Sequence, residues 1–321
     1  MIATWKPSAD HQMLVSRAAL LAQIRHFFAE RTVLEVDPPL LATTSVTDIN
    51  IDSIVATVEG DSHYLQTSPE FFMKRMLAAG SGDIYYLGRA FRDAEQGSRH
   101  NPEFTLLEWY RDGWDEFQLM TEVEDLVSAL FHSQHQAELP VSRLSYADCF
   151  AAVFDLDPHS CELSQLQKLA AENGSRSWRN ESRANCLDLL FSTRVEPQLP
   201  EGLVFVYHYP ACQAALAQIE SCAEGYPVSR RFEVFLQGME LANGYLELTD
   251  ADQQRQRFEA DNAVRAAAQR AAMPIDKNLD LAMRAGLPPC AGVALGVDRL
   301  LMQLQGATSI DRVLPFAWQR C

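Results

Sequence analysis

The chain has 321 residues, of which 47% are hydrophobic and 22% charged, as is usual for a soluble globular protein. No apolar run approaches the ~18 residues that cross a bilayer, and the first residues lack the pattern of a secretion signal, so we expect a cytoplasmic protein with no membrane partner. The net charge of −16 argues against a nucleic-acid-binding protein, because such proteins usually carry a basic surface that neutralises phosphates.

The seven cysteines indicate neither a disulfide framework nor a zinc ribbon. Their number is odd, and no two of them form a C-x-x-C pair. We therefore expect reduced thiols.

In the first half of the chain, apolar residues recur at helical spacing over residues 10–31, which predicts a helix. Pro38 and Pro39 end any regular element after it. Aromatic and apolar residues then predict strands at 84–87 and 104–110, joined by a polar loop at 93–102. A helix is expected over 117–132, and residues 172–183 are the best candidate for a mobile surface loop.

In the second half, residues 231–241 read as a strand that ends at an Asn243-Gly244 turn. Thr249 is the expected cap of a helix that runs to about residue 272. A tight apolar strand at 291–296 leads into a buried helix at 297–302. Long strands interleaved with helices, without a regular βαβ rhythm, predict an α+β fold with an antiparallel β-sheet flanked by helices.

The first segment with candidate functional residues is 91–104. Arg92 ends one strand there, and an arginine fixed at a strand end suits bidentate contact with a phosphate. Phe104 opens the next strand and could stack on a base. The alternative is a charged hairpin tip with a core phenylalanine.

The second segment is residues 238–248, where Glu240 and Glu247 flank Asn243 and the expected turn. Paired carboxylates beside a phosphate site suit Mg²⁺, a hard ion that takes oxygen ligands. A carboxylate can also hold a substrate ammonium group. The alternative is a hairpin with a solvated acidic rim.

The third segment is residues 292–299. Its glycines let a ligand approach the backbone closely, and a helix N-terminus follows, which favours anions. Arg299 lies in the first turn of this helix, against the helix dipole, which points to an anionic partner. The alternative is a surface arginine paired with Asp298 or another acid.

Together, and in this order, these segments resemble the motifs of class II aminoacyl-tRNA synthetases. Residues 34–39 resemble motif 1, the dimer motif, with Pro39 as its proline. Arg92 with His100-x-x-x-Phe104 resembles motif 2, and residues 296–299 resemble motif 3. The resemblance implies the class II catalytic fold and a homodimer.

Three further stretches, 67–70, 99–105 and 240–244, resemble lysyl-tRNA synthetases and, more closely, the truncated paralogues that join (R)-β-lysine to elongation factor P. The likeness covers nearly the whole chain. It implies a single catalytic domain over 1–321, with no anticodon-binding domain, because motif 1 begins too close to Met1 to leave room for one.

The resemblance also implies roles for individual residues. Arg92 would hold the α-phosphate of ATP, Arg299 the γ-phosphate and the adenine, and Glu240 would bind ATP through Mg²⁺ with Glu247 nearby. Carboxylates are needed for a diamino acid because an unpaired buried ammonium is costly. The remaining nucleotide-binding residues would be Asp93, Ala94, Asn101, Phe104, Leu241 and Gly296; the amino acid would meet Ser68, Pro69, Glu70, Tyr110, Asn243, Glu247 and Ala294.

The implied reaction activates β-lysine or lysine as an adenylate and transfers it to a lysine side chain of elongation factor P, forming an amide. No tRNA is expected as a partner. Three alternatives remain: a minimal lysyl-tRNA ligase, a catalytically inactive regulatory paralogue, and an asparagine-type amide synthetase that uses ammonia. The presence of both Arg92 and Arg299 argues against the inactive paralogue.

Two positions depart from the synthetase pattern. Motif 2 of the synthetases carries a glutamate where this chain has Ala94, and the acid comes one residue later, as Glu95. Lysyl-tRNA synthetases have a glycine where this chain has Ala294. A methyl group of this kind is worth about 1–3 kcal/mol in discrimination, and we expect it to bias the pocket from α-lysine towards β-lysine.

The acidic charge of the chain sets a further expectation. Elongation factor P is expected to be acidic too, so long-range attraction would not bring the two together. We therefore expect a local basic patch near the mouth of the active site, formed by Arg176, Arg179 and Arg183.

Overall fold

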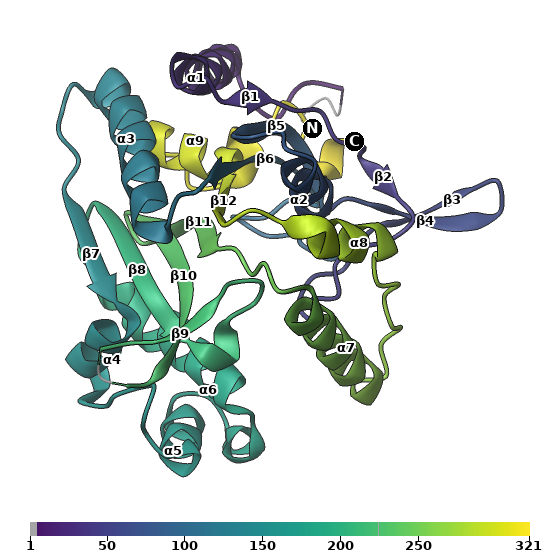
Figure 1. Ribbon diagram of the computed structural model, residues 1–321. Coiled ribbons are helices and arrows are strands. Elements are labelled where there is room, and N and C mark those ends of the chain that lie inside the picture. The colour runs from purple at the N-terminus through teal and green to yellow at the C-terminus, as the bar shows by residue number, and fades with distance from the viewer. Residues whose placement is uncertain (1–4, 224) are drawn as a thin grey trace.

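The computed structural model describes residues 5–223 and 225–321 (Figure 1). Within them, the main sheet runs in the order β1-β5-β6-β12-β11-β10-β8-β7, with β9 paired to β10. Neighbouring strands are antiparallel except for the β1–β5 and β7–β8 pairs, which confirms the α+β prediction. The strands are β1 (Leu34–Glu35), β5 (Ile84–Phe91), β6 (Glu103–Asp112), β7 (Val141–Ser145), β8 (Leu203–Pro210), β9 (Ile219–Ser221), β10 (Pro227–Leu236), β11 (Met239–Leu246) and β12 (Cys290–Gly296).

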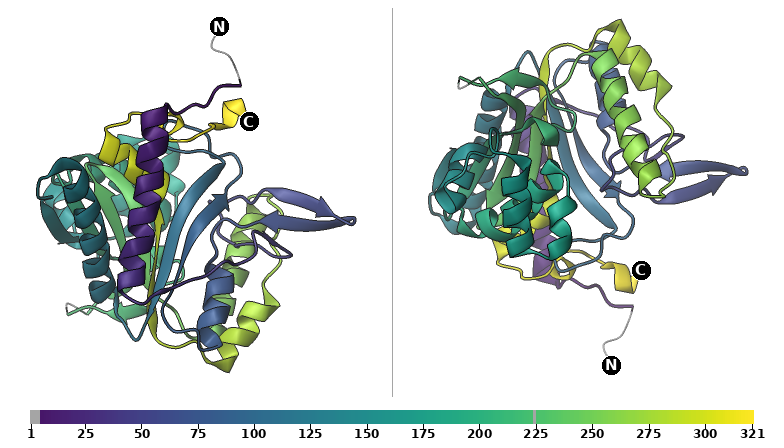
Figure 2. Two further views of the ribbon diagram at one scale, coloured as in Figure 1. Left: turned by 90° about the horizontal axis from the view of Figure 1, so that it is seen from above. Right: turned by 90° about the horizontal axis from the view of Figure 1, so that it is seen from below.

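A small second sheet stands beside the main one. It pairs β2 (Leu41–Ala42) with β4 (Asp61–Leu65), and β4 with β3 (Val55–Val58). The β3–β4 hairpin projects away from the body of the molecule (Figure 2).

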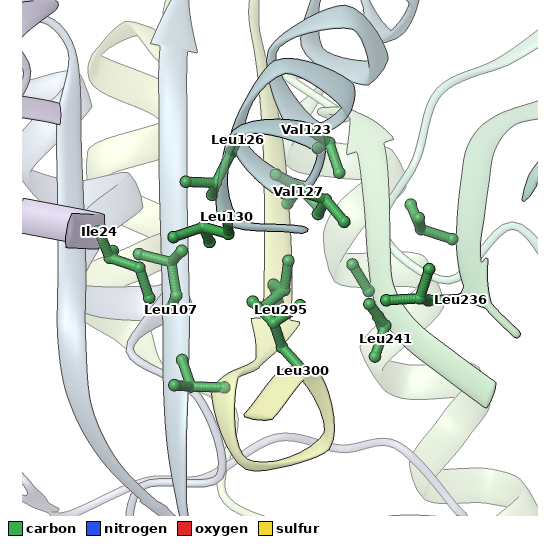
Figure 3. Packing of buried hydrophobic residues seen from close by; sticks show 14 of the residues in the cluster. Ile24, Leu107, Val123, Leu126, Val127, Leu130, Leu236, Leu241, Leu295 and Leu300 are labelled. Atoms are coloured by element: carbon green, nitrogen blue, oxygen red, sulfur yellow. The ribbon is translucent and has the colours of Figure 1, made fainter. Parts of the chain in front are cut away.

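One face of the main sheet carries the core. It is covered by α1 (His11–Glu30), α3 (Glu116–His135) and α9 (Val297–Gln305) (Figures 1 and 2). Side chains alternate along a strand, so Leu107 of β6 and Leu295 of β12 point into this layer, where they are fully buried (Figure 3). Trp109 of β6 is fully buried in the same cluster. Burying each such side chain stabilises the fold by about 1.5–3 kcal/mol. This face is therefore closed to ligands.

The other helices lie around the opposite face and the far end of the sheet. A second buried cluster joins Tyr146, Phe150 and Leu187 to Phe235 of β10, and so fastens a helical layer to the sheet. These helices are α2 (Glu70–Ala78), α4 (Tyr146–Phe154), α5 (Leu163–Asn173), α6 (Arg183–Leu190), α7 (Ala251–Ala267) and α8 (Lys277–Gly286), with short 3₁₀ or π turns at Arg176–Asn180, Phe191–Val195, Glu196–Gln198, Ala211–Gln213, Ile310–Arg312 and Trp318–Arg320. No helix of residues 5–223 and 225–321 is long and apolar enough to cross a membrane.

The helix predicted over 10–31 is confirmed as α1, and Asp10 caps it by accepting from the Met13 N–H. The helix expected after Thr249 is α7, but Asp250 is its cap, and it ends at Ala267 rather than near residue 272. The side chain of Asp250 accepts from two backbone N–H groups of the first turn, which fixes the start of the helix.

The turn predicted at Asn243-Gly244 is wrong, because both residues lie inside β11. The chain instead reverses at Gln237-Gly238, where both φ values are positive, 51° and 72°. Gly244 serves close packing: a Cβ there would lie 2.4 Å from the ring of Phe232.

The segment expected as a mobile loop, residues 172–183, is largely ordered. It contains the end of α5, the 3₁₀ turn at Arg176–Asn180 and the start of α6, which Ser182 caps. Arg183 donates to the carbonyl oxygens of Pro158 and Cys161, which ties the segment down.

Candidate active site

The floor of the candidate site is a trough of small residues on the open face of β12. Gly292, Ala294 and Gly296 line a cavity of about 660 Å³. The register places Tyr110 and Tyr245 on either side of Gly292. Small side chains on a central strand leave room that the larger residues of the neighbouring strands enclose.

Gly292 is required by two functional groups rather than by the backbone. A Cβ at this position would lie 2.4 Å from Cε1 of Tyr110 and 2.5 Å from Oε1 of Glu247. The ring and the carboxylate therefore occupy the space that a side chain would take, and they set the shape of this end of the trough.

This end of the cavity is acidic. Glu108 on β6 is 2% exposed, accepts from the Ser68 hydroxyl at 2.7 Å and from the Tyr110 hydroxyl at 2.8 Å, and lies near Glu70 and Glu247. Burial raises the pKa of Glu108 to about 8, and the charge of Glu70 adds to this shift. Burial also raises the pKa of Glu247 to about 7. Burial therefore favours a neutral or a cation-paired form of these carboxyl groups.

Lys74 lies behind this acidic end, on α2. Its Nζ is 2.5 Å from Oε1 of Glu70 and 2.7 Å from Oε2 of Glu247, and its side chain is 1% exposed. Burial opposes its charge, but the carboxylates of Glu247 and Glu70 more than offset this and raise its pKa. The lysine is therefore a permanent cation.

Asn243 is held in one orientation by a charged neighbour. Arg231 Nε donates to Asn243 Oδ1 at 3.1 Å, so the Asn243 amide nitrogen is free to donate to the Tyr245 hydroxyl at 2.9 Å. Arg231 is itself held by Glu233 at 2.5 Å. This chain of contacts along β10 and β11 fixes the polar side wall of the trough.

The opposite end of the trough is basic and aromatic. The Arg92 guanidinium lies 5.1 Å from the centre of the Phe104 ring and 3.5 Å from Glu95 Oε1. Its Nε is buried and has no hydrogen-bond partner among residues 5–223 and 225–321. A buried N–H without a partner is costly, so this guanidinium is poised for an anion.

Arg299 lies at this basic end and is held at the first turn of α9. Its Nη1 donates to the Glu240 carbonyl at 3.0 Å and lies 3.3 Å from the Glu240 carboxylate, while Nη2 is 2.6 Å from His100 Nε2. Burial and the charge of Arg299 lower the pKa of His100. The imidazole is therefore neutral and accepts from Arg299.

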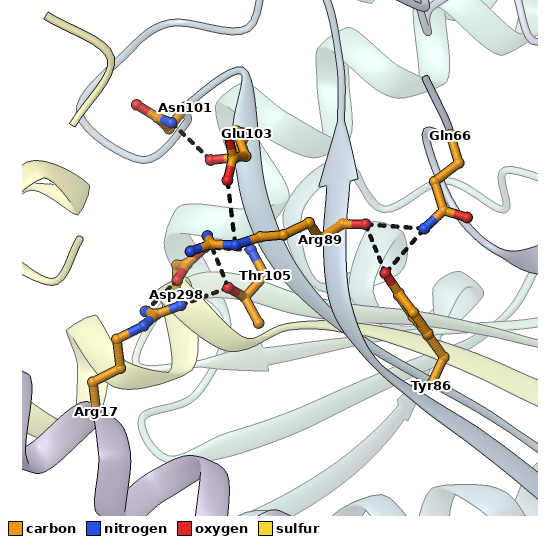
Figure 4. Close-up of polar contacts among 8 residues, drawn as sticks. All are labelled: Arg17, Gln66, Tyr86, Arg89, Asn101, Glu103, Thr105 and Asp298. Carbon is orange, nitrogen blue, oxygen red and sulfur yellow. Dashed lines mark hydrogen bonds and ion pairs between the residues drawn. The ribbon is translucent and has the colours of Figure 1, made fainter. Parts of the chain in front are cut away.

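Asp298 is not the partner of Arg299. It is 2.6 Å from Nη1 of Arg17 on α1 and accepts from the Thr105 N–H at 2.7 Å (Figure 4). Arg17 also donates to the Thr105 hydroxyl at 2.5 Å. This buried network joins α1, β6 and the start of α9, and it leaves Arg299 free to face the cavity.

Most of the predicted site residues line this one cavity, but Pro69, Asp93 and Ala94 do not. Glu95, which the sequence offered as a substitute for Ala94, does line it. Leu241 reaches the cavity, yet its side chain is buried in the core layer (Figure 3). The predicted residues that line the cavity are Ser68, Glu70, Arg92, Asn101, Phe104, Tyr110, Glu240, Leu241, Asn243, Glu247, Ala294, Gly296 and Arg299.

The pairing of Glu240 with Glu247 as ligands of one metal ion remains a prediction, which the extended chain between them does not favour. It depended on a turn between them, whereas the chain is extended along β11 and seven residues of strand separate two side chains by roughly 20 Å. Glu247 contacts Lys74, and Glu240 contacts Arg299. Within the described residues no cluster of three or more His, Cys, Asp or Glu side chains is placed to hold a metal ion.

Asn101, besides lining the cavity, joins two segments of the chain. Its amide donates to the Glu103 carbonyl and accepts from the Trp318 N–H, so it ties the motif 2 loop to the C-terminal segment. The three arginines expected as a basic patch, Arg176, Arg179 and Arg183, are not among the residues that line the cavity.

Sequence reasoning missed Glu108, Lys74 and Arg231. Glu108 had a readable signal, because it is a lone acid within the apolar run Leu106-Leu107-Glu108-Trp109-Tyr110, and a charge on a buried strand marks a ligand or an ion pair. Arg231 gave no such signal, since it follows the polar residues Ser229 and Arg230. Lys74 lies in an apolar run but beside Arg75, so the sequence does not show which of the two cations is buried.

Comparison with known proteins places this site in a family. The family model of class II tRNA synthetases (D, K and N) matches residues 2–320, and the chain belongs to this family. Within it, the chain is similar to proteins named elongation factor P–(R)-β-lysine ligase from Salmonella paratyphi B, Salmonella heidelberg and Salmonella typhi. Each is 47% identical over 327 residues, which cover 99% of this chain and 98% of the relative.

Proposed function

We propose that this protein is an ATP-dependent ligase that activates (R)-β-lysine as an adenylate and transfers it to a lysine side chain of elongation factor P. The observation that carries the proposal is one trough with two chemically distinct ends. Three carboxyl groups, Glu70, Glu108 and Glu247, lie at one end, and Arg92 and Arg299 lie at the other. The relatives' name supplies the substrate and the acceptor.

The basic end fits ATP. Arg92 would hold the α-phosphate with its unpartnered Nε, and Phe104 offers a ring for the adenine. Arg299, already oriented by neutral His100, would hold the γ-phosphate. Glu95 takes the place of the acid missing at Ala94, because it lines the cavity beside Arg92.

Glu240 is the residue that fits Mg²⁺. Its carboxylate is 43% exposed and lies beside Arg299 at the basic end. Mg²⁺ commonly binds through one or two carboxylates and the phosphates of the nucleotide. When bound, the ion would neutralise phosphate charge.

The acidic end fits a diamino acid. Glu70, Glu108 and Glu247 would receive the two ammonium groups, since a buried ammonium needs a paired carboxylate. Asn243 and Tyr110 would fix the chain between them, with Ser68 supporting Glu108. The methyl of Ala294, between Glu108 and Asn243, narrows the pocket where the two amino acids, α-lysine and β-lysine, differ.

The chemistry follows from this alignment. A carboxylate oxygen of the amino acid attacks the α-phosphorus, and the bond from that phosphorus to the pyrophosphate oxygen breaks. Arg92 stabilises the charge on the α-phosphate, and positioning provides most of the acceleration. An amine of the acceptor then attacks the adenylate carbonyl, AMP leaves, and an amide forms.

We propose that residues 1–321 act as one catalytic domain that pairs as a homodimer through the motif 1 region. Leu34, Leu40 and Leu41 of that region are 56%, 40% and 36% exposed, so apolar surface lies open there. No tRNA is proposed as acceptor, because the net charge of −16 does not favour it.

The test is pyrophosphate exchange with (R)-β-lysine, L-lysine, or aspartate plus ammonia, followed by addition of elongation factor P or tRNA. The proposal predicts turnover with β-lysine and transfer of label to the protein. Transfer to tRNA would make this a minimal lysyl-tRNA ligase, and no turnover with any substrate would favour a regulatory paralogue.

A further inference from the structure

Lys74 is the one part of the acidic end that the reaction scheme leaves unexplained. It does not line the cavity, yet the two carboxylates that it contacts, Glu70 and Glu247, both do. These carboxylates come from different elements, α2 and β11. Lys74 therefore joins two walls of the pocket from behind.

The contact with Glu247 is an ion pair rather than a well-aligned hydrogen bond. Nζ lies 2.7 Å from Oε2, but this oxygen has no hydrogen-bond partner of good geometry within the described chain. Its other oxygen, Oε1, lies over Gly292 at the cavity floor. Glu247 thus keeps hydrogen-bonding capacity for a ligand while Lys74 holds its position.

A structural ion pair needs only one carboxylate for a buried lysine. Here one ammonium lies among three buried or half-buried carboxyl groups, Glu70, Glu247 and the nearby Glu108. Bound ammonium groups favour the ionised form of all three carboxyl groups, and in the complex three carboxylates and the Lys74 ammonium then carry two net negative charges. A diamino acid brings two ammonium groups, so the two charges are matched.

We propose that Lys74 is a built-in counterion that positions Glu70 and Glu247 and sets the charge of the pocket to suit a substrate with two ammonium groups. This rests on the proposed function for the identity of that substrate. Lys74 is a positioning residue, since it acts through the two carboxylates. Without it, Glu70 and Glu247 would share a proton in its place, as neighbouring buried carboxyl groups do.

The test is calorimetric binding of (R)-β-lysine and of ATP, separately, to the full chain and to Lys74→Met. We expect the variant to bind the diamino acid about tenfold or more weakly, with ATP affinity unchanged within twofold. Lys168→Met, which removes an exposed lysine from α5, is the matched control. Equal loss of both affinities, or no loss of diamino-acid affinity, would overturn the proposal.

The double variant Lys74→Met with Glu70→Gln separates charge from packing, because it removes one charge of each sign. The proposal expects it to bind the diamino acid more tightly than Lys74→Met, or, if that single variant does not fold, more tightly than Glu70→Gln alone. If the double variant binds the diamino acid no more tightly than its reference variant, the charge-matching part of the proposal is wrong. Binding without adenylate formation in the unmodified protein would refute the proposed function only, whereas failure to bind any diamino acid would refute both.

Discussion

Gly292 and Glu247 share one space: Oε1 of Glu247 lies 2.5 Å from where a Cβ on Gly292 would stand. The same Cβ would lie 2.4 Å from the Tyr110 ring. The glycine of the central strand is therefore required by the shape of this end of the cavity.

Gly292→Ala is the first prediction. The methyl must displace Tyr110 or Glu247, so we expect KM for the amino acid to rise by about tenfold or more and KM for ATP to stay within twofold. Steady-state pyrophosphate exchange measures both. The control is Gly97→Ala, whose Cβ would meet nothing closer than 3.9 Å and which does not line the cavity. A rise in both KM values for Gly292→Ala would contradict the assignment.

Ala294→Gly tests selectivity. The side chain lies between Glu108 and Asn243, and removing its methyl widens the pocket there. We expect the ratio of kcat/KM for (R)-β-lysine over L-lysine to fall by about tenfold, the worth of one methyl group. An unchanged ratio in the variant would show that other residues set the preference.

Glu95→Gln tests whether Glu95 replaces the acid missing at Ala94. Because Glu95 lies 3.5 Å from Arg92 and lines the cavity, we expect KM for ATP to rise several-fold, with little change for the amino acid. Asp93→Asn is the control, since Asp93 does not line the cavity. If both substitutions change KM for ATP equally, Glu95 does not replace the missing acid.

Glu108 makes stability depend on pH. Its pKa is raised from 4.5 to about 8 in the folded protein, so the folded state binds more protons than the unfolded state between these values. The stabilising contribution of the protonated form is thus complete below about pH 4.5 and declines as pH rises towards 8. In Glu108→Gln we expect this decline to be smaller by up to a few kcal/mol.

The measurement is the free energy of unfolding by urea, without substrate, at several pH values from 5 to 9. Glu259→Gln, on the exposed side of α7, is the control. Parallel curves for Glu108→Gln and the unmodified protein would contradict the raised pKa.

Much of the fold follows from local patterns. The spacing of apolar residues predicted α1 and α3, and the run Ala291–Gly296 predicted β12. These predictions work because the side chains that pack against the core must be apolar, and their spacing follows the period of the helix or strand. The turn at Asn243-Gly244 failed for a physical reason. Asparagine and glycine favour turns, but here the asparagine is held by Arg231 and the glycine admits the ring of Phe232.

The residues of the candidate site also fall into those that local sequence motifs predict and those that depend on distant contacts. The motifs that predicted Arg92, Phe104 and Arg299 are local in the sequence, and the three residues line one cavity. Lys74 could not be found, since its meaning depends on Glu247, which lies far away in the sequence and reaches it only through the packing of α2 against the sheet. The metal pairing of Glu240 with Glu247 is not favoured for the converse reason: residues close along the chain lie far apart when the chain is extended.

The most direct test of the whole account is transfer of labelled (R)-β-lysine. The purified protein is incubated with ATP, Mg²⁺ and the labelled amino acid, with either elongation factor P or total tRNA as acceptor, and the position of the label is read by mass spectrometry. The account predicts an amide on one lysine side chain of elongation factor P and no label on tRNA. Label on tRNA, or adenylate formation with L-lysine but not with β-lysine, would contradict it.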